Sequence, residues 1–242
     1  MDALVVGAGA IGRWFAEMIP WKVTFADVDE SAAVSSARSL GERGSVGELR
    51  GESRYDVVVI AVPMRVASET IRVEGKRAER AIVDLTGSMQ EPLSAMEVVA
   101  SGIERVSYHP LFAPEHAPGN IAVSVGESGP ITDKIWDGLE TNGNELIEVD
   151  PAEHDEAMKT IQGRAHAAIL AFGLTASDVP PGLSTPVYEQ LHELLERVTS
   201  GTPQVYADIQ DRFDGAQDVR DAASKLASAD REAFETLYRD AR

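Results

Sequence analysis

Two short apolar runs enclose a glycine-rich turn at the start of the chain, and this arrangement limits the possible folds more than any other feature. Residues 4–6 are Leu-Val-Val, and residues 7–12 read Gly-Ala-Gly-Ala-Ile-Gly. A helix-compatible segment follows, and residues 23–26 form the second apolar run. Strand, glycine turn, helix and strand in this order are typical of a dinucleotide-binding unit. A glycine-rich turn in some other α/β unit is the alternative.

Each glycine of this turn has an expected task. We expect Gly7 to permit the tight turn, Gly9 to let the backbone approach a pyrophosphate, and Gly12 to let the helix pack closely on the strand. The helix would begin near Ala10 and Ile11, where its first N–H groups have no partner within the helix and can bind phosphates.

The residue after the second run, Asp27, indicates which dinucleotide would bind. A carboxylate at the end of this strand accepts hydrogen bonds from the ribose hydroxyls and repels a 2′-phosphate. No arginine follows at positions 28–30 that could receive such a phosphate. The sequence therefore predicts NAD rather than NADP.

Strand-like and helix-like segments alternate up to about residue 150. The continuous apolar runs 56–63 and 81–86 are typical of strands covered on both faces. Further strands are expected at 106–110, 120–125 and 145–149, and helices at 31–40, 64–73, 92–100 and 131–140. This alternation predicts an α/β fold with an N-terminal Rossmann-like doubly wound parallel sheet over residues 1–150.

Beyond residue 150 the pattern is helical only. Helical periods cover 153–174, 187–198, 205–213, 219–226 and 234–238. We therefore expect an all-α C-terminal domain over residues 151–242, which would serve substrate binding and dimerisation. The apolar, small-residue stretch 165–174 favours a homodimer, because a helix this apolar would bury its far side against another subunit.

The charge balance restricts the partners. Forty acidic residues against 22 lysines and arginines give a net charge of −18 over 242 residues, and only five of the bases are lysine. This composition resembles that of proteins adapted to high salt and argues against a nucleic-acid partner. There is no secretory signal and no apolar run of the roughly 20 residues that a membrane span needs. Together with the absence of cysteine, these features favour a cytoplasmic protein without disulfides.

Histidines are the candidate chemical groups. His109 lies where a late strand runs into a loop, near the edge at which open α/β sheets bind ligands, although a packing role fits as well. On the long helix, Asp155, Gln162 and His166 are spaced to share one stripe, with His154 beside it. A cleft wall or a solvated face would both produce this stripe. The spacing of the histidines predicts no metal site.

Several blocks, taken in order, resemble the prephenate/arogenate dehydrogenase family. The matching segments are 7–12, Asp27, Val62-Pro63, 84–86, the His109 block 107–114, 153–166, and 186–188 with Arg197. The resemblance runs from residue 3 to about 211. The His109 block and the block from His154 to His166 are specific, whereas the glycine turn is shared with many families.

The resemblance implies the roles of these residues. His109 would be the catalytic histidine, which takes the proton of the 4-hydroxyl of prephenate as hydride leaves for NAD. Arg197 would bind a substrate carboxylate, and His154, Gln162, His166 and Ser88 would line the substrate site. The cofactor would contact Gly7, Gly9, Ala10, Ile11, Gly12, Asp27, Val62 and Pro63. The family also points to a homodimer.

The sequence departs from the family at one functional position. Relatives often have a lysine two residues after the serine that Ser88 matches, and here residue 90 is glutamine. Arogenate is therefore an alternative substrate, and a dinucleotide-binding sensor without turnover is an alternative function. A β-hydroxyacid dehydrogenase is less consistent, because Gly163 stands where that family has an asparagine one turn after a lysine such as Lys159.

Overall fold

The computed structural model describes residues 1–180 and 182–241 and divides the chain into two compact units, Met1–Asp155 and Glu156–Arg242. The sequence places the boundary at 150, where helix α6 (Pro151–Met158) begins. The division falls later because the first turn of α6 packs with the first unit. His154 and Asp155 are both buried there.

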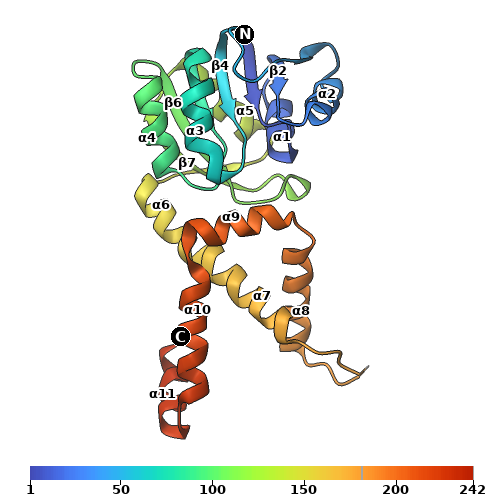
Figure 1. The fold of residues 1–242 in the computed structure, drawn as a ribbon, viewed down its shortest axis with the longest axis vertical. Helices are drawn as coiled ribbons and strands as arrows, with labels where there is room; N and C mark the ends of the chain where they lie inside the picture. The colour runs from blue at the N-terminus through green and yellow to red at the C-terminus, as the bar shows by residue number, and fades with distance from the viewer. Residues whose placement is uncertain (181, 242) are drawn as a thin grey trace. The chain divides into compact units, whose positions relative to one another are not determined.

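Strands of the first unit form one sheet in the order β3-β2-β1-β4-β5-β6-β7-β8 (Figure 1). The strands are β1 (Asp2–Val6), β2 (Lys22–Ala26), β3 (Gly44–Val46), β4 (Tyr55–Ile60), β5 (Ala78–Asp84), β6 (Glu104–Pro110), β7 (Asn120–Glu127) and β8 (Glu145–Glu148). Strands β1 to β6 run parallel, and the order reverses between β1 and β4. This is the doubly wound arrangement that the sequence predicts.

Helices cover both faces of this sheet (Figure 1). They are α1 (Ala10–Met18), α2 (Glu30–Ser39), α3 (Met64–Glu74), α4 (Gln90–Val99) and α5 (Pro130–Thr141). Alternate strand residues enter two separate cores, because successive side chains of a strand point to opposite faces. Val5 packs in the core under α1, α2 and α5, which includes the fully buried Phe15, and Leu4 packs in the core under α3 and α4.

The expectation of an all-parallel sheet is wrong for the last two strands. Strand β7 runs antiparallel to β6, and β8 is parallel to β7. Only residues 111–119 connect β6 to β7, and they contain a short 3₁₀ turn at Pro114–His116 rather than a helix. A parallel return needs a crossover of roughly a dozen residues or more, usually with a helix. This short connection therefore favours the antiparallel pairing.

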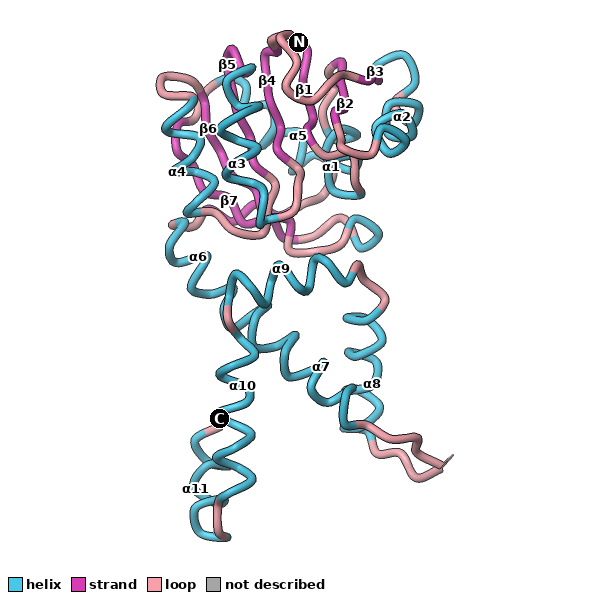
Figure 2. The backbone as a smooth tube through the Cα atoms, in the orientation of Figure 1, coloured by secondary structure: helices cyan, strands magenta, loops and turns pink. Residues whose placement is uncertain are grey.

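Beyond the first unit the described residues contain helices and no strand (Figure 2). The elements are the end of α6, a π-helical turn (Lys159–Arg164), α7 (Ala165–Thr175), α8 (Pro186–Thr199), α9 (Pro203–Phe213), α10 (Gly215–Ser228) and α11 (Arg231–Asp240). No helix of the described ranges is long and apolar enough to cross a membrane.

The single long helix expected at 153–174 is interrupted by the π-helical turn. Gly163 of this turn meets the start of α10 backbone to backbone, since a Cβ placed on Gly215 would lie 2.0 Å from the Gly163 carbonyl carbon. A π turn holds more residues than an α turn. Steps of seven and four residues across it therefore do not keep Asp155, Gln162 and His166 on one stripe, which corrects the sequence-based expectation.

Candidate active site

The glycine turn between β1 and α1 has little room for side chains. Gly7 has a φ of +102°, and a Cβ there would lie 2.1 Å from the Ala61 carbonyl oxygen. A Cβ on Gly12 would lie 2.1 Å from the Gly7 carbonyl oxygen. Gly9 precedes the first residue of α1, and a Cβ there would meet nothing within 4 Å. Gly7 and Gly12 thus serve the packing, and Gly9 borders open space, as a phosphate site requires.

Asp27 follows β2 and lies beside this turn. Its Oδ2 accepts a hydrogen bond of 2.7 Å from the Ala8 N–H, and its Oδ1 accepts one of 2.8 Å from the Asp29 N–H. Val62 follows β4 and contacts the turn, since its Cγ1 lies 3.3 Å from a Cβ placed on Gly7. The residues expected at the cofactor are therefore gathered at the carboxyl ends of β1, β2 and β4, with Pro63 immediately before α3.

His109 lies near the end of β6 and is only 7% exposed. Its Nδ1 is 2.9 Å from Nε2 of His154, and the two rings meet edge to face with centroids 5.1 Å apart. His154, 2% exposed, places its own Nδ1 2.9 Å from Oδ1 of Asp155. The first unit thus contains a buried chain of two imidazoles and a carboxylate.

Asp155 is held at the start of α4. Its Oδ1 accepts a hydrogen bond of 2.9 Å from the Met89 N–H, and its Oδ2 accepts a longer one of 3.4 Å from the Gln90 N–H. Backbone donors and the helix dipole at this position favour the ionised carboxylate. Ser88 precedes these donors and is buried. His109 and His154 are therefore in contact in the first unit, and Ser88 lies beside the residues that hold Asp155. Their roles in substrate binding stay predictions.

The surroundings keep His109 neutral. Burial, with a smaller contribution from the neighbouring His154, lowers the pKa of His109 to about 3, while Asp155 opposes the shift. A neutral imidazole has one nitrogen with a proton and one with a lone pair. His109 can consequently act as a base at neutral pH.

A second buried carboxyl group was not anticipated from the sequence. Asp84 ends β5 with no exposure, and its Oδ2 accepts hydrogen bonds from Ser107 Oγ at 2.8 Å and Thr86 Oγ1 at 3.1 Å. Burial, opposed by these hydroxyls and reinforced by Asp155, raises the pKa of Asp84 to about 7. An acid directly after the apolar residues 81–83 was the available signal in the sequence.

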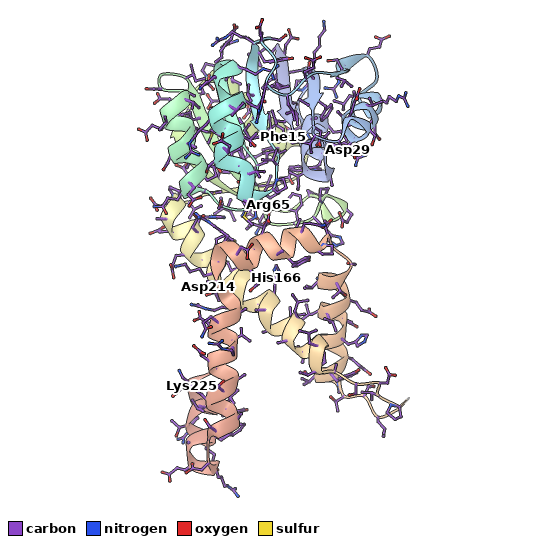
Figure 3. All side chains as sticks on the ribbon, in the orientation of Figure 1. Phe15, Asp29, Arg65, His166, Asp214 and Lys225 are labelled. Atoms are coloured by element: carbon purple, nitrogen blue, oxygen red, sulfur yellow. The ribbon has the colours of Figure 1, made fainter. Side chains whose placement is uncertain are left out.

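The other expected substrate residues belong to the second unit. His166, labelled in Figure 3, belongs to α7. It packs edge to face on Tyr206 of α9, with ring centroids 5.0 Å apart, and burial lowers its pKa. Gln162 lies in the π-helical turn. Arg197 of α8 is exposed, and its guanidinium makes no hydrogen bond or ion pair within the described part of the chain. Their roles in substrate binding stay predictions.

No family model matches the chain. Among curated proteins it is similar to a probable arogenate/prephenate dehydrogenase of Methanocaldococcus jannaschii, with 25% identity over 86% of this chain and 51% of that protein. It is also similar to a 4-amino-4-deoxyprephenate dehydrogenase of Streptomyces pristinaespiralis, with 29% identity over 99% of this chain and 89% of that protein. The chain thus spans about half the length of the first relative and most of the second.

Solved structures share the fold. Prephenate dehydrogenase from A. aeolicus, in complex with hydroxyphenyl propionate and NAD⁺, superposes with a TM-score of 0.68 at 17% identity, covering 99% of this chain and 94% of that one. Synechocystis arogenate dehydrogenase gives a TM-score of 0.60 at 15% identity, covering 99% and 97%.

The sheet and its glycine turn define a Rossmann-like α/β protein of the class used by dinucleotide-dependent dehydrogenases. Within that class, the chain is similar in sequence and in fold to proteins of the prephenate/arogenate dehydrogenase family. The comparisons thus agree with the resemblance noted from the sequence.

Proposed function

We propose that this protein is an NAD-dependent dehydrogenase that converts prephenate to 4-hydroxyphenylpyruvate with loss of CO₂. The observation that carries the proposal is His109, a buried neutral imidazole held by His154 in the unit that also contains the glycine turn. The curated relatives support the same chemistry at 25% and 29% identity.

The residues present fit a dinucleotide. Gly9 borders open space at the start of α1, and the Asp27 carboxylate is fixed beside the same turn. NAD bound there would supply the acceptor for the hydride from C4 of the substrate. The glycine turn would hold the pyrophosphate through backbone N–H groups, and Asp27 would accept hydrogen bonds from the ribose.

His109 would handle the proton of the reaction. Loss of hydride from C4 turns the 4-hydroxyl into a carbonyl, and its proton passes to the lone pair of His109. The bond between the ring and its carboxylate then breaks, CO₂ leaves, and the electron pair restores the aromatic ring. The oxygen at C4 takes a proton back from His109, so that the base is regenerated and no net proton is consumed.

An NADH absorbance assay with prephenate tests this function. In His109→Asn the side chain can still form a hydrogen bond but cannot act as a base, so kcat should fall by ~10²–10⁴ with little change in KM. His116→Asn is the matched control, because His116 is exposed in the 3₁₀ turn of the same unit. Near-normal kcat in His109→Asn would assign the base elsewhere.

The relative that this chain covers most completely points to a second candidate substrate. The Streptomyces pristinaespiralis protein is named for 4-amino-4-deoxyprephenate. Arogenate is a third candidate, because the Methanocaldococcus jannaschii and Synechocystis proteins are named for it. A 4-amine and a 4-hydroxyl can both donate a hydrogen bond to an imidazole lone pair. Comparing kcat/KM for prephenate, arogenate and 4-amino-4-deoxyprephenate ranks the candidates. Binding of NAD without NADH formation from any of them would favour the sensor function instead.

A further inference from the structure

We propose that Asp155 and His154 are positioning residues that fix the tautomer of His109, with the proton on Nδ1 and the lone pair on Nε2. The catalytic consequence rests on the function proposed above. The tautomer itself is a property of the protein without substrate and can be measured separately.

Asp155 determines which atoms donate in the hydrogen bonds that join it to His154 and His154 to His109. Asp155 Oδ1 already accepts a hydrogen bond from the Met89 N–H at 2.9 Å, in a position that favours the ionised carboxylate. An ionised carboxylate can only accept. The 2.9 Å contact between this oxygen and Nδ1 of His154 therefore requires a proton on that nitrogen.

The proton on His154 Nδ1 determines the next link. At a pH at which His154 carries only this one proton, its lone pair is on Nε2, which lies 2.9 Å from Nδ1 of His109. Nδ1 of His109 must donate across this contact, because two lone pairs facing each other would repel. Nε2 is left as the basic nitrogen of His109.

The basic nitrogen faces a glycine. A Cβ placed on Gly87 would lie 3.4 Å from Nε2 of His109. Gly87 belongs to the turn between β5 and α4, directly before Ser88. Gly87 places no side chain at this position, which is also bordered by Sδ of Met64, 3.0 Å from the same Cβ.

The intervening His154 also separates a charge from the base. A carboxylate in direct contact with His109 would favour the charged imidazolium and raise the pKa of His109. With His154 between them, Asp155 orients the proton of His109 while burial keeps the ring neutral. When His109 takes a proton, its Nδ1–H bond to His154 is retained and the Asp155 charge balances the imidazolium.

Long-range ¹H–¹⁵N correlation spectra of the ¹⁵N-histidine-labelled protein test the assignment without substrate. We expect Nδ1 of His109 to be protonated and Nε2 to show the shift of an unprotonated ring nitrogen. In Asp155→Ala the acceptor that holds the proton on His154 Nδ1 is lost, so His154 is no longer fixed in one tautomer. The proton of His109 should then be shared between Nδ1 and Nε2, and kcat should fall by tenfold or more while KM changes less than threefold.

Two further variants separate positioning from folding. Asp150→Asn is the control, since the Asp150 side chain caps the start of α6 through the Ala152 and Glu153 N–H groups. Its backbone carbonyl, which accepts from the His154 N–H at 2.9 Å, is unchanged in this variant. The control should leave the His109 spectrum and kcat unchanged. His154→Gln can offer an oxygen to His109 Nδ1 and should retain the tautomer, whereas His154→Leu should give a mixture of tautomers.

The outcomes are distinguishable from those of the proposed function. If the protein turns over none of the three substrates, the proposed function fails, while the spectra still decide the tautomer. A proton on Nε2 of His109 in the unmutated protein would overturn the inference. So would an unchanged His109 tautomer in a folded Asp155→Ala variant.

Discussion

The backbone N–H of Ala8 donates a hydrogen bond of 2.7 Å to Oδ2 of Asp27, which ties the acid after β2 to the glycine turn after β1. The second carboxylate oxygen is tied to the Asp29 N–H. The carboxylate is thereby aimed before any ligand binds, and each oxygen keeps a lone pair for a ribose hydroxyl.

Removing this carboxylate should relax the choice of cofactor. The unmutated protein should prefer NAD, and Asp27→Ala should reduce the ratio of kcat/KM for NAD over NADP by about tenfold or more, since a hydrogen bond to a charged group is worth about 1.5–3 kcal/mol. Asp29→Ala is the control, because Asp29 caps α2 and should affect stability but not cofactor choice. Equal turnover with NADP in the unmutated protein would remove the argument.

The proposed role of Arg197 in substrate binding can be tested through the KM for the substrate. If the guanidinium binds a substrate carboxylate, Arg197→Ala should raise KM by tenfold or more and cost only a few tenths of a kcal/mol in stability, because the side chain is exposed. Arg164 is the comparison, since its Nε lies 2.7 Å from Oδ2 of Asp218 and is already paired. A KM within twofold in Arg197→Ala, with a larger rise in Arg164→Ala, would transfer the role to Arg164.

Asp84 should make stability depend on pH. The pKa of Asp84 is raised from 3.8 to about 7, so between these values the folded protein keeps a proton that the unfolded chain releases. Its contribution therefore lowers the free energy of unfolding as pH rises through this window, by an amount on the order of a few kcal/mol. His109 contributes the opposite slope between about 3 and 6.5, because the unfolded chain takes up the proton first.

The variant Asp84→Asn isolates the Asp84 contribution. The free energy of unfolding of Asp84→Asn minus that of the unmutated protein should increase from pH 5 to pH 8. Urea denaturation at both pH values measures this difference. A difference that does not change with pH would show that Asp84 is ionised throughout this range.

Salt should stabilise the fold. With a net charge of −18, self-repulsion is strong at low ionic strength and is screened as the Debye length falls to about 3 Å at 1 M. We expect Tm to rise with KCl up to molar concentrations. Thermal denaturation monitored by circular dichroism measures this. A flat or falling Tm would exclude an adaptation of this kind.

The chain should form a homodimer. In α7 only Ala167 is buried, and Leu174 at its end is 88% exposed although the helix is almost entirely apolar. Light scattering in high salt should give about twice 26.0 kDa, and Leu174→Glu should shift the mass toward the monomer. Val98→Glu, at a 78% exposed position on α4, should leave the mass unchanged. A mass near 26.0 kDa for the unmutated protein would refute the dimer.

Local patterns made the first unit predictable. Residues 4–27 carry the strand, turn, helix and strand in consecutive order, and the structure places β1, α1, β2 and Asp27 accordingly. The direction of β7 could not be predicted in the same way, because an apolar strand pattern does not indicate which way the strand runs. Only the short connection 111–119 contained that information.

The candidate site was only partly visible in the sequence. His109 could be selected from its position and its family resemblance, but the contact with His154 joins residues 45 positions apart. The resemblance assigned His154 to the substrate, and the structure shows its side chain buried between His109 and Asp155. Asp84 was missed because a buried carboxyl group is recognised by its surroundings, which periodicity does not report.

The π-helical turn at Lys159–Arg164 has a consequence for comparing this chain with its relatives. A wider turn accommodates an extra residue, so a relative with an unbroken α-helix at this place would align correctly only across a one-residue gap. An alignment without the gap would match either His154 or His166 to its counterpart, but not both. Roles transferred without the gap from a relative whose helix is unbroken would therefore be offset by one position on one side of this turn.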